Sequence, residues 1–451
     1  MADRIITVCS GGEASTPRRL RVFMNTLGSR GDVEPFVALG VALRAAGHAV
    51  TLCTAERFRS FVVDHGLEYG FMSDGILRLA GTDEGKGVLD GGKEGVLDYL
   101  AKLRKLSAQA LPMQRQMVRE SWAACERPDV IVYHPKAAGA PHFAQKLGVP
   151  AVLVLLQPMY VPTVDFPNPL APSLPFRSGW YNKMTYGMFT ALIPFGTSGF
   201  TRGWREEAGL APEPTSSSVL TQPDGSELLV LHAHSPIVIA TPADWPSWAT
   251  ALGYWPLRAQ PGWRPSQPLA DFLAAGEPPV YVGFGSMAGK DPAALTQLVV
   301  AALAAAGARG VVATGWGGLR RAGHVPDTVL MLDSAPHEWL FPRMAAVVHH
   351  GGAGTTAAGL RAGRPAVVCP FGMDQVFWAW RVHELGVGSE PIPQARLTVA
   401  RLAAAITLVT RDAQLRERAA ALGERLRAED GAAAAVAKLE EHVERVRTAR
   451  V

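Results

Sequence analysis

The chain has 451 residues, of which 48% are apolar and 19% are charged. This composition is typical of a globular protein of two or three domains, at ~150 residues each, and excludes long disordered regions. The 44 lysines and arginines nearly balance the 40 aspartates and glutamates, so the charge does not predict binding to nucleic acid. No apolar run reaches the ~18 residues of a membrane-spanning helix, and residues 1–19 lack the apolar stretch of a signal peptide. The four cysteines show no metal-ligand spacing. We expect a cytoplasmic protein, a monomer or weak dimer, with no structural metal.

The first half of the chain alternates predicted strands and helices. An apolar run at 20–27 ends in the glycine-containing loop 28–32, and residues 33–46 follow with helical apolar spacing. Further strands are predicted at 49–54, 129–133, 151–156 and 237–240. This order predicts an α/β domain with a doubly wound parallel sheet. Ligands bind such sheets at the carboxyl ends of the strands, where the loop 28–32 lies.

Residues 159–200 are unusually rich in proline and aromatic residues. One interpretation is a loop and a helix packed on the domain surface. The other is an apolar wall for a bulky substrate, because ligand pockets are lined mostly by apolar and aromatic side chains. Under the second interpretation the candidate residues for binding that substrate are Phe166, Trp180, Tyr181 and, from the helix predicted before this segment, His142.

A segment rich in proline and tryptophan at 246–270 predicts a linker, after which the α/β pattern resumes. The strands expected in the second half are 280–284, 310–313, 328–332, 345–349 and 366–369. An amphipathic helix is expected at the end of the chain. The predicted units are an N-terminal lead at 1–19 that is open to disorder, a domain at 20–245, the linker, a domain at 271–430 and the terminal helix at 431–451.

The densest motif runs from a predicted strand into a helix: His349-His350-Gly351-Gly352-Ala353-Gly354-Thr355-Thr356. Glycines allow close backbone approach, and a helix start presents unpaired N–H groups and the positive end of the helix dipole. This combination suits a diphosphate, with His350 as an added donor. The alternative is a tight structural turn. The chain lacks GxxxxGK[ST], which argues against a P-loop, and no GxGxxG follows its first strand.

Three shorter motifs lie at other strand ends. Asp374 and Gln375 follow the strand at 366–369 and are suited to bind neighbouring sugar hydroxyls, although Asp374 could equally cap the next helix. Ser286 follows the strand at 280–284, and Ala335 and His337 precede a short aromatic segment.

Taken together, these motifs resemble those of the family 1 glycosyltransferases. The run from Ser334 to Ile392 is similar to their donor-binding region, and the loop from Gly28 to Pro35 and the segments at 244–246 and 253–255 also resemble this family. The similarity points to the sterol glucosyltransferase-like branch and its bacterial antibiotic-tailoring relatives. It implies the GT-B fold, in which two facing Rossmann-like domains bind the acceptor and the nucleotide-sugar.

The resemblance also implies residue roles. Ala335 and His337 would meet the base, and Asp374 and Gln375 would bind the sugar. The diphosphate would be bound by His350, Ala353, Gly354 and Thr355, with Ser286 as a further contact. Ser29, Arg30 and Asp32 would face the donor across the cleft. Ser334 and Ala358 stand where plant members have Trp and Glu, which leaves the choice between uridine and thymidine open.

The predicted activity is inverting transfer of a hexose, with glucose from UDP-glucose as the first choice, to a hydroxyl of a sterol, polyketide or macrolide. Asp32 would be the general base, with His134 and His142 as the other candidates. We expect no metal or other cofactor, since Asp83-Glu84 does not resemble a metal-binding DxD. The alternatives are a transferase of dTDP-deoxysugars, a nucleotide-sugar epimerase or hydrolase, and a non-catalytic nucleotide-binding partner protein.

Overall fold

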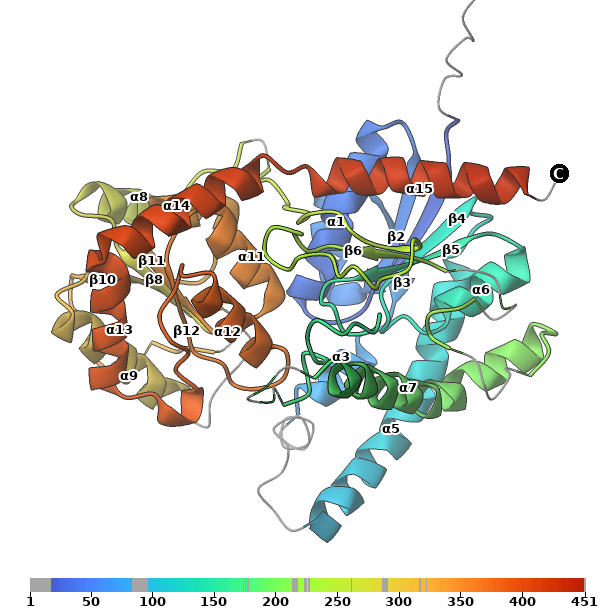
Figure 1. Ribbon diagram of the computed structural model, residues 1–451, viewed down its shortest axis with the longest axis horizontal. Helices are drawn as coiled ribbons and strands as arrows, with labels where there is room; N and C mark the ends of the chain where they lie inside the picture. Colours follow the sequence, from blue (N-terminus) through green and yellow to red (C-terminus); the bar gives the residue numbers. More distant parts are fainter. Residues whose placement is uncertain are drawn as a thin grey trace, which may run out of the picture.

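The computed structural model contains two parallel β-sheets, each flanked by helices (Figure 1). It describes residues 18–82 and 96–449, except 173, 175, 177, 213–217, 223, 224, 226, 227, 261, 286–290, 316, 317 and 322. The lead at 1–19 therefore lies almost wholly outside the described residues.

The first sheet has seven parallel strands in the order β3-β2-β1-β4-β5-β6-β7. Their bounds are β1 Arg21–Asn25, β2 Ala49–Ala55, β3 Glu68–Met72, β4 Val130–Tyr133, β5 Ala151–Leu155, β6 Leu229–His232 and β7 Ala249–Ala251. The central strands are apolar runs buried on both faces, as parallel sheets require. The strand order reverses between β1 and β4, so the loops that follow these two strands meet.

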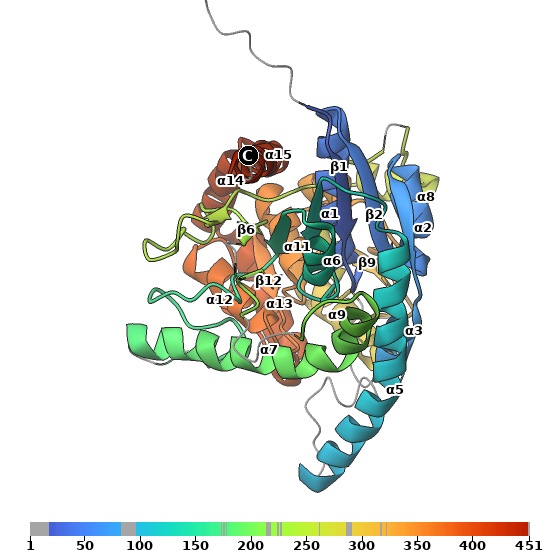
Figure 2. The same cartoon turned by 90° about the vertical axis from the view of Figure 1, so that its right-hand side faces the viewer.

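Helices cover both faces of this sheet. Their bounds are α1 Arg30–Ala45, α2 Arg59–Asp64, α3 Gly75–Ala80, α5 Val96–Ala123, α6 Ala140–Leu147 and α7 Gly179–Glu207, with a 3-10 turn at Glu56–Phe58. The long helices α5 and α7 pack against each other along one edge of the domain (Figure 2).

The end of this domain differs from the sequence prediction at two places. The strand predicted at 237–240 is wrong: the last apolar run to enter the sheet is β6, and residues 236–239 form a turn in which the N–H groups of Val238 and Ile239 both donate to the Ser235 carbonyl. The segment predicted as a linker contains β7, which pairs in parallel with β6.

The second sheet has five parallel strands in the order β10-β9-β8-β11-β12. Its strands are β8 Val280–Gly283, β9 Gly310–Ala313, β10 Val329–Leu332, β11 Ala346–His349 and β12 Ala366–Val368. The helices are α8 Gln267–Ala274, α9 Pro292–Ala305, α10 His337–Leu340, α11 Ala353–Arg361, α12 Gln375–Glu384, α13 Val399–Arg411 and α14 Ala413–Arg427, with 3-10 turns at Phe341–Arg343 and Gln394–Arg396. Here the order reverses between β8 and β11.

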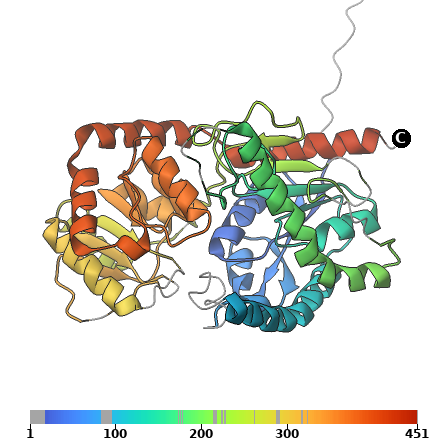
Figure 3. The same ribbon diagram turned by 60° about the horizontal axis from the view of Figure 1, so that its bottom comes forward.

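The terminal helix α15, Gly431–Thr448, returns to the first domain (Figure 3). It packs on α1, and its apolar residues Val436, Leu439 and Val443 belong to the same buried cluster as the first strands. His48 Nε2 and Glu440 Oε1 lie 3.0 Å apart at this contact. The chain therefore crosses between the domains twice.

Candidate active site

Each sheet brings candidate residues together at the point where its strand order reverses, which is where open α/β sheets bind ligands. In the first domain the β1–α1 loop carries Ser29, Arg30 and Asp32, and the β4–α6 loop carries His134 and Lys136. In the second domain the loop after β8 meets the glycine-rich loop after β11.

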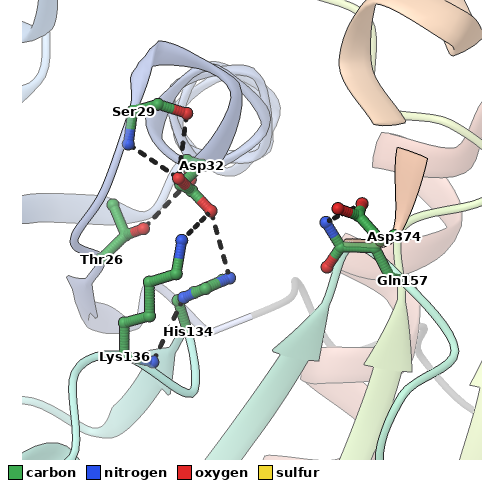
Figure 4. A network of polar contacts seen from close by, with 7 residues as sticks. All are labelled: Thr26, Ser29, Asp32, His134, Lys136, Gln157 and Asp374. Atoms are coloured by element: carbon green, nitrogen blue, oxygen red, sulfur yellow. Dashed lines mark hydrogen bonds and ion pairs between the residues drawn. The ribbon is translucent and has the colours of Figure 1, made fainter. Parts of the chain in front are cut away.

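Asp32 is held rigidly at the start of α1 (Figure 4). It lies inside the first turn of the helix, with Ser29 as the N-cap, so it is not itself the N-cap residue. Its Oδ2 accepts hydrogen bonds from the Ser29 N–H at 2.7 Å and the Ser29 Oγ at 3.0 Å. Gly28 has φ +142°, and a Cβ there would lie 2.1 Å from Oδ2, so the loop requires glycine. The Asp32 side chain is 12% exposed.

The other carboxylate oxygen of Asp32, Oδ1, faces two side chains from the β4–α6 loop. Lys136 Nζ donates to Oδ1 at 2.8 Å, and His134 Nε2 lies 3.7 Å from it. The Lys136 N–H donates to His134 Nδ1, which places the proton of the neutral ring on Nε2. His134 therefore faces the carboxylate with its N–H and is not arranged as a base.

The electrostatics keep Asp32 ionised. Burial alone would raise its pKa, but Lys136, His134 and the Ser29 N–H together bring the pKa below its ordinary value. Burial lowers the pKa of His134 to about 4, against the attraction of Asp32. At neutral pH this end of the site therefore presents a carboxylate, an ammonium and a neutral imidazole.

In the second domain, His350 lies among glycines that leave room for its ring. A Cβ on Gly285, where φ is +61°, would lie 3.1 Å from His350 Cε1, and one on Gly352 would lie 2.6 Å from Nε2. Burial, with His337 nearby, lowers the pKa of His350 to about 4, so its ring is neutral. Among the described residues, no hydrogen-bond partner faces its buried Nδ1. The Nδ1 atom of this ring could therefore bond a ligand.

The glycine-rich loop leads directly into α11. Gly352 is the N-cap of this helix, and Gly354 in its first turn is exposed. The N–H groups of Ala353, Gly354 and Thr355 therefore point out of the helix start, where the dipole favours an anion. The predicted diphosphate residues lie together as expected, although their role as ligands stays a prediction.

His337 begins α10 and stacks on Phe341, with ring centroids 4.3 Å apart. Burial lowers its pKa to about 4, and Glu34 and Arg30 of the first domain act on it electrostatically. The exposed ion pair between Arg30 and Glu34 thus faces the second domain near His337, while a contact of Arg30 with the donor stays a prediction. Ala335, two residues before His337, is half-buried in the same segment.

Asp374 and Gln375 lie at the start of α12, facing the first domain. Gln157, just after β5, donates from Nε2 to Asp374 Oδ2 at 3.3 Å across the domain interface. Burial raises the pKa of Asp374, and the negative charge of Asp32 adds to this effect. Gln375 Oε1 accepts from the Phe371 N–H at 2.8 Å, so the amide oxygen shapes the loop and leaves the NH₂ group for a ligand.

The four acceptor candidates are scattered. Phe166 packs on Phe377 of the second domain with ring centroids 5.9 Å apart, so it lies at the domain interface. Trp180 is 76% exposed on α7, and Tyr181 donates from its hydroxyl to the Pro172 carbonyl. His142 instead lies in the protein interior, with its Nδ1 2.8 Å from Arg205 Nη1 between α6 and α7. No contact in the described structure supports an acceptor role for His142.

Sequence reasoning missed a cavity beside Asp32. It lies where β1, β3 and the helices α5, α6 and α7 converge, and it is lined mainly by apolar side chains. Residues lining it include Asn25, Leu27, Met117, Lys136, Phe143 and Phe200. No local motif marks these positions. Ser286, predicted to contact phosphate, lies outside the described residues.

In the described part of the chain, no three His, Cys, Asp or Glu side chains cluster in a way that could hold a metal ion. None of the described helices combines the length and apolarity needed to cross a bilayer.

Comparisons with known proteins agree with this geometry. Residues 22–163 match the model of the glycosyltransferase family 28 N-terminal domain, and residues 297–442 match that of the erythromycin biosynthesis protein CIII-like C-terminal domain. The chain is 34% identical over 428 residues to the sterol 3-beta-glucosyltransferase UGT80B1 of Arabidopsis thaliana, covering 94% of this chain and 68% of the relative. The chain belongs to family 1 of the glycosyltransferases.

Other relatives are longer than this chain. It is 34% identical to the sterol 3-beta-glucosyltransferase UGT80A2 of Arabidopsis thaliana, with 94% of this chain and 66% of that protein covered. The sterol 3-beta-glucosyltransferase of Cryptococcus neoformans is also 34% identical, but 93% of this chain matches only 27% of it. The chain thus spans about two thirds of these plant relatives and about a quarter of the fungal one.

Solved structures confirm the predicted GT-B fold of two facing α/β domains. The glycosyltransferase of kitacinnamycin, 22% identical, aligns over 95% of this chain and all of its own with a TM-score of 0.68. The glycosyltransferase SnogD from Streptomyces nogalater, 26% identical, aligns over 94% of this chain and 99% of its own with a TM-score of 0.61.

Proposed function

We propose that this glycosyltransferase moves glucose from UDP-glucose to the hydroxyl of a sterol or a similarly lipophilic molecule, with inversion at the anomeric carbon. The observation that carries the proposal is the setting of Asp32: this buried, ionised carboxylate is paired with Lys136, which also lines an apolar cavity, and its helix α1 contacts α11 of the other domain. The similarity to two sterol 3-beta-glucosyltransferases supports glucose as the sugar and a sterol as the acceptor.

The chemistry follows from the groups present. Asp32 Oδ1 takes the proton of the acceptor hydroxyl as its oxygen attacks the anomeric carbon, and the bond from that carbon to the diphosphate breaks. General-base assistance of this kind contributes ~10²–10⁴-fold. The diphosphate leaves with both electrons, and its charge is met by the α11 N–H groups and the neutral His350, which donates one N–H. Asp374 and Gln375 bind the sugar hydroxyls.

The cavity beside Asp32 supports an apolar acceptor. Asn25, which is 1% exposed, lines this cavity. Its buried Oδ1 has no hydrogen-bond partner among the described residues, so this oxygen can accept a hydrogen bond from a substrate hydroxyl. The cavity is partly open to solvent and has a volume of about 60 Å³. This is smaller than the ~300–1,000 Å³ of typical ligand pockets, so we expect only part of the acceptor to enter it.

The test is a matrix of donors and acceptors. UDP-glucose and dTDP-glucose are each incubated with a sterol, a flavonoid, a macrolide and a simple sugar, and glucoside formation is followed by mass spectrometry. We expect a sterol glucoside from UDP-glucose. Preference for the simple sugar, or for dTDP-glucose with the macrolide, would overturn the assignment of acceptor or donor.

A further inference from the structure

The two oxygens of the Asp32 carboxylate have different partners. Oδ2 accepts two hydrogen bonds from Ser29 within its own loop, so it is fully used in holding the start of α1. Oδ1 is therefore the oxygen that can take a proton from an acceptor. That oxygen is already covered by Lys136 Nζ at 2.8 Å, and His134 Nε2 lies farther from it, at 3.7 Å.

Lys136 connects this oxygen to the acceptor cavity. It stands in the β4–α6 loop, lines the cavity and leaves 53% of its side chain exposed. A half-exposed lysine can swing into water at small cost, because its ion pair is only partly shielded from solvent. The Ser29 hydroxyl donates to Oδ2 within the same helix start, and His134 is fixed by the Lys136 N–H, which donates to its Nδ1. Lys136 is thus the movable partner of the carboxylate.

We propose that Lys136 covers the catalytic oxygen of Asp32 until an acceptor enters the cavity and displaces it, so that the base acts on an acceptor and not on water. This positioning role rests on the proposed transfer reaction. The reaction it restrains is hydrolysis: a water molecule gives its proton to Oδ1, its oxygen bonds to the anomeric carbon of UDP-glucose, and the bond to the diphosphate breaks to release UDP and glucose.

The ion pair between Lys136 and Asp32 also influences the pH below which Asp32 becomes protonated and can no longer act as a base. The charged or titratable groups facing Asp32 are Lys136 and His134 from the second loop and Asp374 from the other domain. His134 stays neutral at working pH, and the charge of Asp374 opposes ionisation of Asp32. Lys136 is therefore the main cation that stabilises the charged base. Its removal raises the pKa of Asp32 and moves the acidic limb of the kcat/KM profile to higher pH.

The experiment uses the full chain with Lys136→Met, Lys136→Gln and Lys136→Arg, and with Lys146→Met on the exposed side of α6 as the matched control. UDP release is measured with UDP-glucose alone and then with the acceptor. We expect Lys136→Met and Lys136→Gln to increase the ratio of hydrolysis to transfer by about tenfold or more and to shift the acidic limb upward. Lys136→Arg should keep the ratio of hydrolysis to transfer near that of the wild type, and the Lys146→Met control should match the wild type.

Two results overturn the proposal. Unchanged hydrolysis and an unchanged acidic limb in both Lys136→Met and Lys136→Gln would make Lys136 a surface residue. Loss of transfer without added hydrolysis, in variants that still bind UDP, would make it part of the transfer step. A wild-type protein that glycosylates none of the acceptors would instead contradict the proposed function. Thermal melting of each variant shows that it is folded, and Lys136→Gln serves if Lys136→Met is not.

Discussion

Replacing Asp32 by asparagine separates its structural and chemical roles. The amide keeps the size of the carboxylate, and its oxygen can still accept both bonds that Ser29 donates. Its NH₂ group then meets Lys136, whose half-exposed side chain is free to turn toward solvent. The cost to the start of α1 should stay near the ~1 kcal/mol typical of a weakened cap.

The chemical cost of this substitution is much larger. Loss of a general base lowers the rate ~10²–10⁴-fold, which corresponds to about 2.7–5.5 kcal/mol on the barrier. The assay compares kcat at saturating UDP-glucose and acceptor, and calorimetry gives the Kd for UDP. We expect kcat to fall by at least ~10²-fold while UDP binding, which depends on the other domain, stays within about twofold. A variant that keeps a tenth of the wild-type kcat would refute the assignment of Asp32 as base.

The pH dependence of the free energy of unfolding tests whether the pKa of Asp32 is lowered in the folded protein. Its folded pKa lies below the value in the unfolded chain. The stabilisation is therefore fully present above the unfolded value of about 3.9 and is lost as the pH falls through the folded pKa. We expect the free energy of unfolding of Asp32→Asn to depend less on pH below about pH 4 than that of the wild type. Near pH 7 it should be lower than in the wild type only by the contribution of the lost ion pair with Lys136 and the weakened start of α1. Identical acid profiles would contradict the lowered pKa.

Four further outcomes follow from the site and its supports. His350→Ala should weaken UDP binding about 10–100-fold through loss of a hydrogen bond to a charged ligand, measured by calorimetry; unchanged affinity and rate would leave it structural. Gly352→Ala should reproduce this loss, because its Cβ would lie 2.6 Å from the His350 ring, and normal affinity would show that the ring can relocate. Trp180→Ala and Tyr181→Ala should raise the acceptor KM if α7 extends the acceptor site, and an untouched KM would make these residues ordinary surface and packing residues. Phe143→Ala should cost about 3–5 kcal/mol in urea unfolding, since the ring is fully buried; a cost below 1 kcal/mol would contradict tight packing there.

The sequence was sufficient for the features that are local. Continuous apolar runs marked all five strands of the second sheet and β1, β2, β4 and β5 of the first, although β3 and β6 were not predicted. The loops after the predicted strands carried Asp32, His350 and Asp374, because ligands bind at strand ends. The strand expected at 237–240 failed because a short apolar segment looks the same whether it pairs in a sheet or packs in a turn. β7 was hidden for the opposite reason: its three residues are too few to show a strand pattern.

The remaining parts of the site depend on strand order. Lys136 lies 104 residues from Asp32, and Gln157 lies 217 residues from Asp374. Neither has a local signature, and both become neighbours only because β1 lies next to β4 and the two domains face each other. The surroundings of His142 could not be predicted for the same reason. Its partner Arg205 lies 63 residues away in the sequence, and only the packing of α7 on α6 brings the two side chains together.

The return of α15 to the first domain has a consequence for synthesis on the ribosome. Val436, Leu439 and Val443 fill the core that β1, β2 and α1 begin, yet about 180 residues separate β7 from α15. At ~5–20 residues per second, the first domain waits on the order of 10–40 s for the helix that closes its apolar surface. During that interval the exposed face of α1 is open to chaperones and to self-association, and the whole second domain must emerge before the first is complete.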